Sequence, residues 1–266
     1  MNVLKNLSIG MVGAVVVGLG TSGAAQASSF LSTSTGQVGS VDPLTGTFTQ
    51  LTSGPTFTDI ALSSSGELFG NTFGELYRIN PGAGSSFIGN LGATLNALGF
   101  SGSNVLYGAG GSGFYTVDTV TGGASLVANI PGFSSSGDIV FNPASNRFLA
   151  TSASGTADTL FSIALDGTAT QIGSIGFSSV YGLFFDNGTL FGYTADRQQL
   201  TIDLATGAGT FNKPVTGVVG AIYGSASLAS TGPTTSVPEP ATMWGLFGIA
   251  AFGTLSRLLG KQQQKA

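Results

Sequence analysis

The sequence contains no cysteine and no histidine among its 266 residues. Their absence excludes disulfide bonds, metal sites built from thiolate or imidazole ligands, and catalytic groups that use a cysteine nucleophile or a histidine base. The fold must therefore be held together by its hydrophobic core and its backbone hydrogen bonds alone, which requires a domain of reasonable size. No motif indicates a cofactor.

Charged residues are also scarce, at 8% of the chain. Between residues 28 and 236 there are eleven acidic side chains against four basic ones, a net charge of −7. A negative surface repels the phosphates of nucleic acids, so we expect no nucleic-acid partner. The chain has 43 glycines and 19 phenylalanines, a composition that favours many short strands joined by tight turns over long helices.

The N-terminal residues 1–27 have the pattern of a secretory signal peptide. Lys5 supplies a positive start, an uncharged apolar stretch follows over residues 7–19, and Ala25 and Ala27 form an A-x-A cleavage site. The alternative is an ordinary N-terminal membrane anchor, but the apolar stretch is short for a membrane span. We therefore expect export through the Sec translocon and cleavage after Ala27.

The C-terminal end has three parts. A linker rich in Ser, Thr, Gly and Pro covers residues 229–236, and an uncharged stretch of near membrane length covers residues 240–256. Between them lies Val237, Pro238, Glu239 and Pro240, and the chain closes with the basic residues Arg257, Lys261 and Lys265. Positive charge after the apolar stretch keeps that end cytoplasmic and leaves the body outside, in agreement with the signal peptide.

This tail, residues 237–266, resembles the PEP-CTERM sorting domain, in which a Val-Pro-Glu-Pro signature precedes an apolar helix with a tryptophan near its start, here Trp244. The resemblance implies that an exosortase recognises Pro238, Glu239 and Pro240 and processes the chain near them. It also implies a membrane anchor before processing, and then the cell surface or an exopolysaccharide-rich matrix. The basic residues are more widely spread than is usual in that family. A plain C-terminal anchor is the alternative.

The body, residues 28–228, repeats. An Asp-x-x-Thr-Gly turn follows a short strand at Asp42, Asp118 and Asp203, and looser copies begin at Asn80 and near Ala164. Aspartate and glycine in this spacing are typical of tight turns. The five copies are separated by 38, 38, 46 and 39 positions, and we assign the longest step to extra loop around residues 142–145 and 152–159.

Four hairpins with an aromatic second strand accompany these turns, and Asn187-Gly188 is a strong hairpin-turn signal. The fifth unit lacks its own last strand. Five units of about four strands predict an all-β, five-bladed β-propeller. The strand around Phe30 is expected to close the ring by pairing with the strand around Tyr223. The body resembles the low-charge propeller-like domains that often precede this sorting tail. A β-sandwich is the alternative, although it does not explain a nearly fixed repeat.

Asp59, Asn96 and Asp138 precede apolar strands at similar places in three repeats. Their side chains are weak candidates for a Ca²⁺ ring facing a central channel. The favoured interpretation is that they cap turns, and we assign no metal and no catalytic residue. The predicted function is a non-catalytic surface protein associated with extracellular polysaccharide. A secreted polysaccharide hydrolase or lyase and an envelope protein-protein adaptor are the alternatives.

Overall fold

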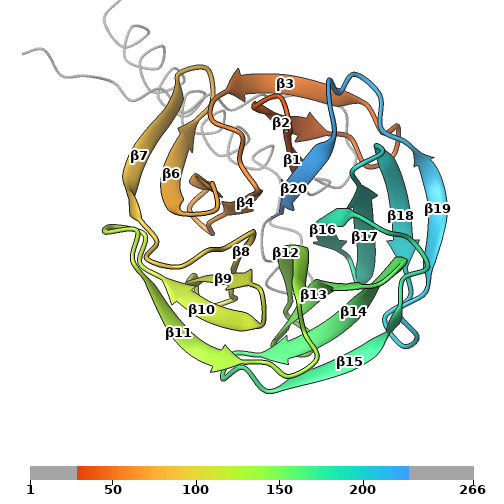
Figure 1. Cartoon of the computed structure of the whole chain (residues 1–266). Helices are drawn as coiled ribbons and strands as arrows, with labels where there is room; N and C mark the ends of the chain where they lie inside the picture. The colour runs from red at the N-terminus through yellow and green to blue at the C-terminus, as the bar shows by residue number, and fades with distance from the viewer. Residues whose placement is uncertain (1–28, 228–266) are drawn as a thin grey trace, which may run out of the picture.

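The body is a five-bladed β-propeller (Figure 1), and the computed structural model describes residues 29–227. Its strands form five four-stranded antiparallel sheets around a central axis. Blade 1 consists, from the axis outward, of β20 (Ile222–Ala226), β1 (Ser29–Thr33), β2 (Gln37–Val41) and β3 (Phe48–Ser53). Blade 2 consists of β4 (Asp59–Leu62), β5 (Leu68–Asn71), β6 (Glu75–Asn80) and β7 (Gly84–Asn90).

The other three blades are each continuous in sequence. Blade 3 consists of β8 (Ala97–Phe100), β9 (Leu106–Gly110), β10 (Gly113–Val117) and β11 (Ala124–Asn129). Blade 4 consists of β12 (Ser135–Asn142), β13 (Arg147–Ser154), β14 (Ala157–Ala164) and β15 (Ala169–Ser174). Blade 5 consists of β16 (Val180–Asp186), β17 (Thr189–Thr194), β18 (Gln198–Ile202) and β19 (Gly209–Pro214).

The predicted ring closure is confirmed. Strand β20 supplies the inner position of blade 1 and pairs with β1, with Phe30 opposite Ala226 and Leu31 opposite Ser225. The repeat seen in the sequence therefore contains the two outer strands of one blade and the two inner strands of the next. Because every repeat straddles two blades, only the pairing of the first strand with the last completes the ring.

The repeated Asp-x-x-Thr-Gly turns have the expected chemistry. In blade 3, Asp118 Oδ1 accepts hydrogen bonds from the backbone N–H groups of Val120 and Thr121 at 2.7 and 2.9 Å, and Gly122 has a φ of +84°. The hydrogen bond from the Thr121 N–H, followed by that from Val120, lowers the pKa of the exposed Asp118 carboxyl. The turns beginning at Asp42 and Asp203 make the same bonds.

These turns also dock each blade onto its neighbour. The carbonyl oxygen of Thr121, in blade 3, lies so close to Gly89 of β7 that a Cβ atom on Gly89 would be only 2.0 Å from it. The turn around Thr206 meets Gly173 of β15 in the same way, with a corresponding distance of 2.1 Å. A glycine on the outer strand of one blade therefore admits the turn of the next.

Hydrophobic cores lie between the blades rather than within them. Five clusters of buried side chains each join facing sheets of two neighbouring blades. Between blades 3 and 4 the fully buried Phe148 ring contacts the rings of Tyr107, Phe114 and Phe141 at centroid distances of 5.1, 5.8 and 5.3 Å. Burial of a phenylalanine of this kind contributes about 1.5–3 kcal/mol to stability.

All five outer strands carry a β-bulge. The register of each outer pair shifts by one residue, for example between Leu76 and Tyr77 where β6 pairs with β7. A bulge twists an exposed strand and makes its free edge a poor template for another chain. The five outer edges are the ones that ring closure cannot cover, so the bulges protect the sites most exposed to edge-to-edge association.

Blade 4 differs from the expectation that its longer repeat reflects extra loop. Strands β12, β13 and β14 each have eight residues, and the β13–β14 ladder continues to the pair Ser154 and Ala157. The segment 152–159 is thus a long hairpin with a tight turn. By contrast, the Asn187-Gly188 hairpin is confirmed, since both residues have positive φ, +46° and +81°, as a two-residue hairpin turn requires.

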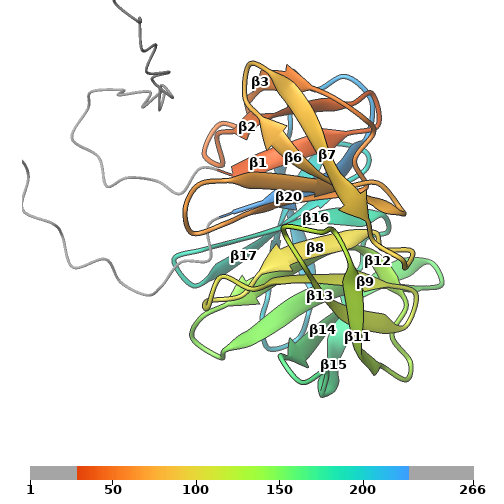
Figure 2. The ribbon, with the colours of Figure 1, turned by 90° about the vertical axis from the view of Figure 1, so that its left-hand side faces the viewer.

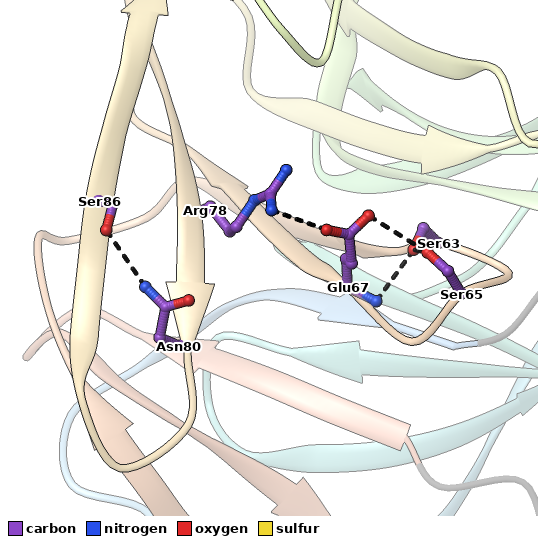
Figure 3. A network of polar contacts seen from close by, with 6 residues as sticks. All are labelled: Ser63, Ser65, Glu67, Arg78, Asn80 and Ser86. Atoms are coloured by element: carbon purple, nitrogen blue, oxygen red, sulfur yellow. Dashed lines mark hydrogen bonds and ion pairs between the residues drawn. The ribbon is translucent and has the colours of Figure 1, made fainter. Parts of the chain in front are cut away.

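An exposed polar network fixes the β4–β5 hairpin of blade 2 (Figure 3). Arg78 forms an ion pair with Glu67 at 2.8 Å, the only ion pair within residues 29–227. The Ser63 hydroxyl oxygen accepts a hydrogen bond from the Glu67 N–H, and the Ser65 hydroxyl donates one to the Glu67 carboxylate. With both side chains nearly half exposed, the pair contributes about 0–1 kcal/mol.

The predicted signal peptide with Ala25 and Ala27, the linker and the sorting tail lie outside the described residues. That holds for Val237 to Pro240 and for the basic residues Arg257, Lys261 and Lys265. Between residues 29 and 227 no helix has the length and apolar character needed to cross a membrane.

Candidate functional site

A pocket of about 440 Å³ opens where the five inner strands begin. Every blade contributes to it, so the pocket lies on the propeller axis. Its lining consists of Thr56, Thr58, Thr72, Phe73, Asn96, Ser136, Gly137, Tyr181 and Tyr223. None of these side chains carries a charge.

Two tyrosines from neighbouring blades form an aromatic wall of the pocket. Tyr181 of β16 and Tyr223 of β20 meet edge to face, with ring centroids 6.2 Å apart and an angle of 75° between the rings. Each is followed by a glycine, and a Cβ atom on Gly224 would lie within 2.3 Å of the Asp59 carboxyl. The Tyr-Gly sequence therefore lets the strand approach the axis closely while the preceding tyrosine faces the pocket.

Two hydroxyl groups of the pocket, those of Ser136 and Thr58, use their hydrogens within the protein. Ser136 donates to the Asp158 carboxylate at 2.9 Å, and Thr58 donates to the backbone carbonyl of Asn71 at 3.1 Å. Asn96 donates through Nδ2 to the carbonyl of Ser135 at 3.0 Å, which leaves its Oδ1 buried without a partner. The polar groups of the wall therefore have unused acceptor capacity and suit a ligand rich in hydrogen-bond donors.

Asp158 lies next to the pocket and contacts its lining residue Ser136. Besides the Ser136 hydroxyl it accepts the backbone N–H of Val180 at 2.7 Å, so one carboxylate joins blade 4 to blade 5 at the rim of the pocket. Burial raises the pKa of Asp158. Its hydrogen bonds orient Ser136 and the start of β16, the strand that carries Tyr181.

Two of the three acid or amide residues proposed from the sequence meet on the axis beneath the pocket. Asp59 and Asp138 follow the pocket residues Thr58 and Gly137 directly and are 0% and 1% exposed. Burial raises the pKa of both carboxyl groups well above the usual range of aspartate. Neither caps a turn. Asp59 instead accepts the N–H of Leu98 in blade 3, and Asp138 that of Leu183 in blade 5.

Asn96 does not join this pair. In the strand register Ala97, not Asn96, occupies the place in β8 that Asp59 occupies in β4, because Ala97 pairs with Ala109 where Asp59 pairs with Asn71. The side chain of Asn96 consequently belongs to the pocket one level higher. Within residues 29–227 no group of three or more acidic side chains is arranged as metal ligands.

Sequence reasoning missed the aromatic part of the site. Tyr181 and Tyr223 were not selected, although both occur in an apolar-Tyr-Gly pattern at the start of an inner strand. That shared pattern is a usable signal. Phe73, 60% exposed in the loop after β5, has no repeated counterpart that would have marked it.

No family model matches the chain, and no curated protein sequence matches it significantly. Solved structures do resemble it. A chain of the nidogen/laminin complex is 10% identical with a TM-score of 0.55, covering 77% of this chain and 99% of that one. A protein of unknown function from Bacteroides thetaiotaomicron is 12% identical with a TM-score of 0.50, covering 76% and 62%.

Virginiamycin B lyase from Staphylococcus aureus is 15% identical with a TM-score of 0.44, covering 67% of this chain and 63% of that one. At identities this low a likeness shows the fold and nothing about ligands or reactions. The comparisons therefore show that the body of this chain has the fold of a five-bladed β-propeller.

Proposed function

We propose that this chain is an exported, non-catalytic surface protein whose propeller binds a neutral polysaccharide in the axial pocket. The observation that carries the proposal is the pocket lining, which combines two tyrosines and a phenylalanine with hydroxyl and amide groups and includes no charged side chain. A volume of about 440 Å³ falls within the usual range of small-molecule pockets.

A sugar suits this lining on both of its surfaces. The apolar C–H face of a pyranose ring packs on tyrosine or phenylalanine, and its hydroxyl groups donate to unused acceptors such as those of Ser136 and Thr58. An anionic ligand finds no basic side chain in the pocket.

Delivery to the surface follows from the two ends of the chain as the sequence predicts them. The signal peptide directs export, and the resemblance to a PEP-CTERM tail implies anchoring in the membrane and processing by an exosortase. Strand β1 begins and β20 ends at the same face of the propeller (Figure 2). Tyr223 is at the start of β20 and therefore at the other end of that strand. An anchor that follows β20 would thus be attached at the face opposite to the pocket.

The same geometry favours binding over cleavage of the polysaccharide. Hydrolysis of a glycosidic bond ordinarily requires two carboxyl groups that reach the substrate. No carboxyl group lines the pocket, and Asp59 and Asp138 lie beneath its floor with both side chains buried. A glycoside hydrolase of the ordinary type would need these acids to be reached by a ligand.

A glycan array probed with the body, residues 28–236, tests the proposal. We expect retention on neutral oligosaccharides, no release of smaller sugars, and a loss of affinity of about fivefold or more in Tyr181→Ala, since an aromatic contact contributes ~1 kcal/mol or more. Phe211→Ala is the matched control, because it removes a half-exposed ring on β19 outside the pocket. Equal binding by the two variants would place the glycan elsewhere, and release of sugar would establish an enzyme.

A further inference from the structure

The Asp59 and Asp138 carboxyl groups face each other on the propeller axis. They come from the inner strands of blades 2 and 4, which are not neighbours, and both are sealed from solvent. Below them lies a small cavity of about 20 Å³, enough for about one water molecule. A buried pair of like charges in such a place is strongly unfavourable unless something neutralises it.

The hydrogen bonds around the pair show where a neutralising group is missing. Both oxygens of Asp59 accept backbone N–H groups, from Ile60 at 2.8 Å and from Leu98 at 2.7 Å. Asp138 Oδ2 accepts the N–H of Leu183 at 2.5 Å and lies 3.1 Å from the Ser225 hydroxyl. Asp138 Oδ1 is buried and has no N–H or O–H donor from another residue.

The two carboxyl groups lie against consecutive residues of β20: a Cβ atom on Gly224 would be 2.3 Å from Asp59 Oδ1, and the hydroxyl of Ser225 is 3.1 Å from Asp138 Oδ2. The charge of Asp138 also contributes to the raised pKa of Asp59. Two ionised carboxylates in such a place cannot hydrogen bond with each other, because neither carries a hydrogen. A single proton between them supplies the missing donor, satisfies Asp138 Oδ1 and reduces the charge of the pair from −2 to −1.

No cationic side chain of the neighbouring strands replaces that proton. The strands packed against the pair are β1, β5, β8, β9, β13, β16 and β20. The titratable groups they carry are Tyr107, Tyr181 and Tyr223 together with Arg147 and Asp186, and the last two lie at the far ends of β13 and β16 from the pocket. The neighbouring strands thus provide no counter-ion at this level.

We propose that Asp59 and Asp138 form a proton-binding site that holds one shared proton at neutral pH and thereby ties the inner strands of the propeller together across its axis. The proton connects blade 2 to blade 4 directly. Through the N–H groups of Leu98 and Leu183 the same pair also holds blades 3 and 5. This site is independent of whether the pocket above it binds a glycan.

The pair makes the stability of the propeller depend on pH with a defined sign. The native state raises the pKa of the pair through burial, so it retains a proton that the unfolded chain releases above about pH 4. Stability from the pair is therefore fully present below that pH and is lost as the pH rises to the native pKa. Across this window the unfolding equilibrium constant rises tenfold per pH unit, the slope for one proton.

Infrared spectroscopy of the full-length protein in detergent tests the proposal without any substitution. At neutral pH we expect the carbonyl band of a protonated carboxylic acid, and its loss in Asp138→Asn and in Asp59→Asn. Absence of this band from the unsubstituted protein would overturn the proposal, and so would persistence of the band in both variants.

Chemical denaturation of the same proteins as a function of pH gives the second measurement. Asp138→Asn is the informative variant, since its amide N–H can replace the shared proton. The tenfold rise of the unfolding equilibrium constant per pH unit that the shared proton causes should therefore be absent from this variant. Asp118→Asn, which alters an exposed turn, should keep the original slope. Equal slopes for all three would refute the shared proton. A stabilisation by Ca²⁺ that Asp138→Asn abolishes would also refute it and identify a cation site instead.

Discussion

Each repeat turn packs on a glycine of the preceding blade, and substitution of the glycines involved should lower the stability of the propeller. Gly122 has a positive φ and also contacts Gly89, whose φ is not positive. A third glycine, Gly82, has a positive φ of +77° with no atom within 4 Å of where its Cβ would lie. Alanine at these three positions therefore separates backbone strain from the contact between blades.

The expected losses in the free energy of unfolding follow from this geometry. Gly82→Ala forces an alanine into the left-handed region and costs about 1–2 kcal/mol. Gly89→Ala places a methyl group 2.0 Å from the Thr121 oxygen, an overpacking that costs about 1–3 kcal/mol or more. Gly122→Ala combines both, with a Cβ 2.8 Å from the Gly89 backbone, and should cost about 2–5 kcal/mol.

Urea denaturation measures the free energy of unfolding of all three variants. Far-ultraviolet circular dichroism is the suitable signal, because the single tryptophan lies in the tail and its fluorescence would not report on the body. The double variant Gly89→Ala with Gly122→Ala should lose less than the sum of the two single losses, because both act on one contact. If Gly89→Ala is as stable as the unsubstituted protein, the turn does not dock on β7 and the account of blade assembly is wrong.

Three further outcomes are expected. Leu31→Ala, in the strand that closes the ring, removes a fully buried side chain and should cost about 2–5 kcal/mol by calorimetry or denaturation, whereas a loss below 1 kcal/mol would argue against closure by β1. Phe148→Ala, which empties the aromatic cluster between blades 3 and 4, should cost about 3–5 kcal/mol in the same assay, and a neutral effect would contradict the packing described. Deletion of residues 237–266 should leave the melting temperature of the body unchanged. In cells with an exosortase, the mass of the surface protein should show that the apolar stretch and the basic end have been removed, and an intact end at Ala266 would refute processing.

The fold was predictable because the repeat carries local signals that agree with one another. Each Asp-x-x-Thr-Gly turn contains an aspartate that bonds its own backbone and a glycine at positive φ, and both can be recognised without knowledge of distant contacts. The pairing of Phe30 with the strand after Tyr223 could be inferred as well, since a ring with an incomplete last unit leaves one edge open.

The candidate site was less accessible to sequence reasoning because it depends on register. Asp59, Asn96 and Asp138 occupy similar places in the repeats, yet a shift of one residue separates the buried pair from the pocket. Hydrogen bonds to strands of other blades, such as that from Leu183 to Asp138, also join residues 45 positions apart. Spacing within a repeat does not encode such contacts.

The central claim is that a neutral glycan binds in the axial pocket against Tyr181 and Tyr223. The chain contains six tyrosines, all within the described body, so selective ¹³C labelling of tyrosine rings reports on the whole propeller with few signals. On titration with a neutral oligosaccharide we predict that the ring signals of Tyr181 and Tyr223 shift together, while those of Tyr77 and Tyr115 on outer parts of blades 2 and 3 do not. Shifts confined to Tyr77 or Tyr115, or no shift at Tyr181 and Tyr223 while the glycan is bound, would contradict the claim.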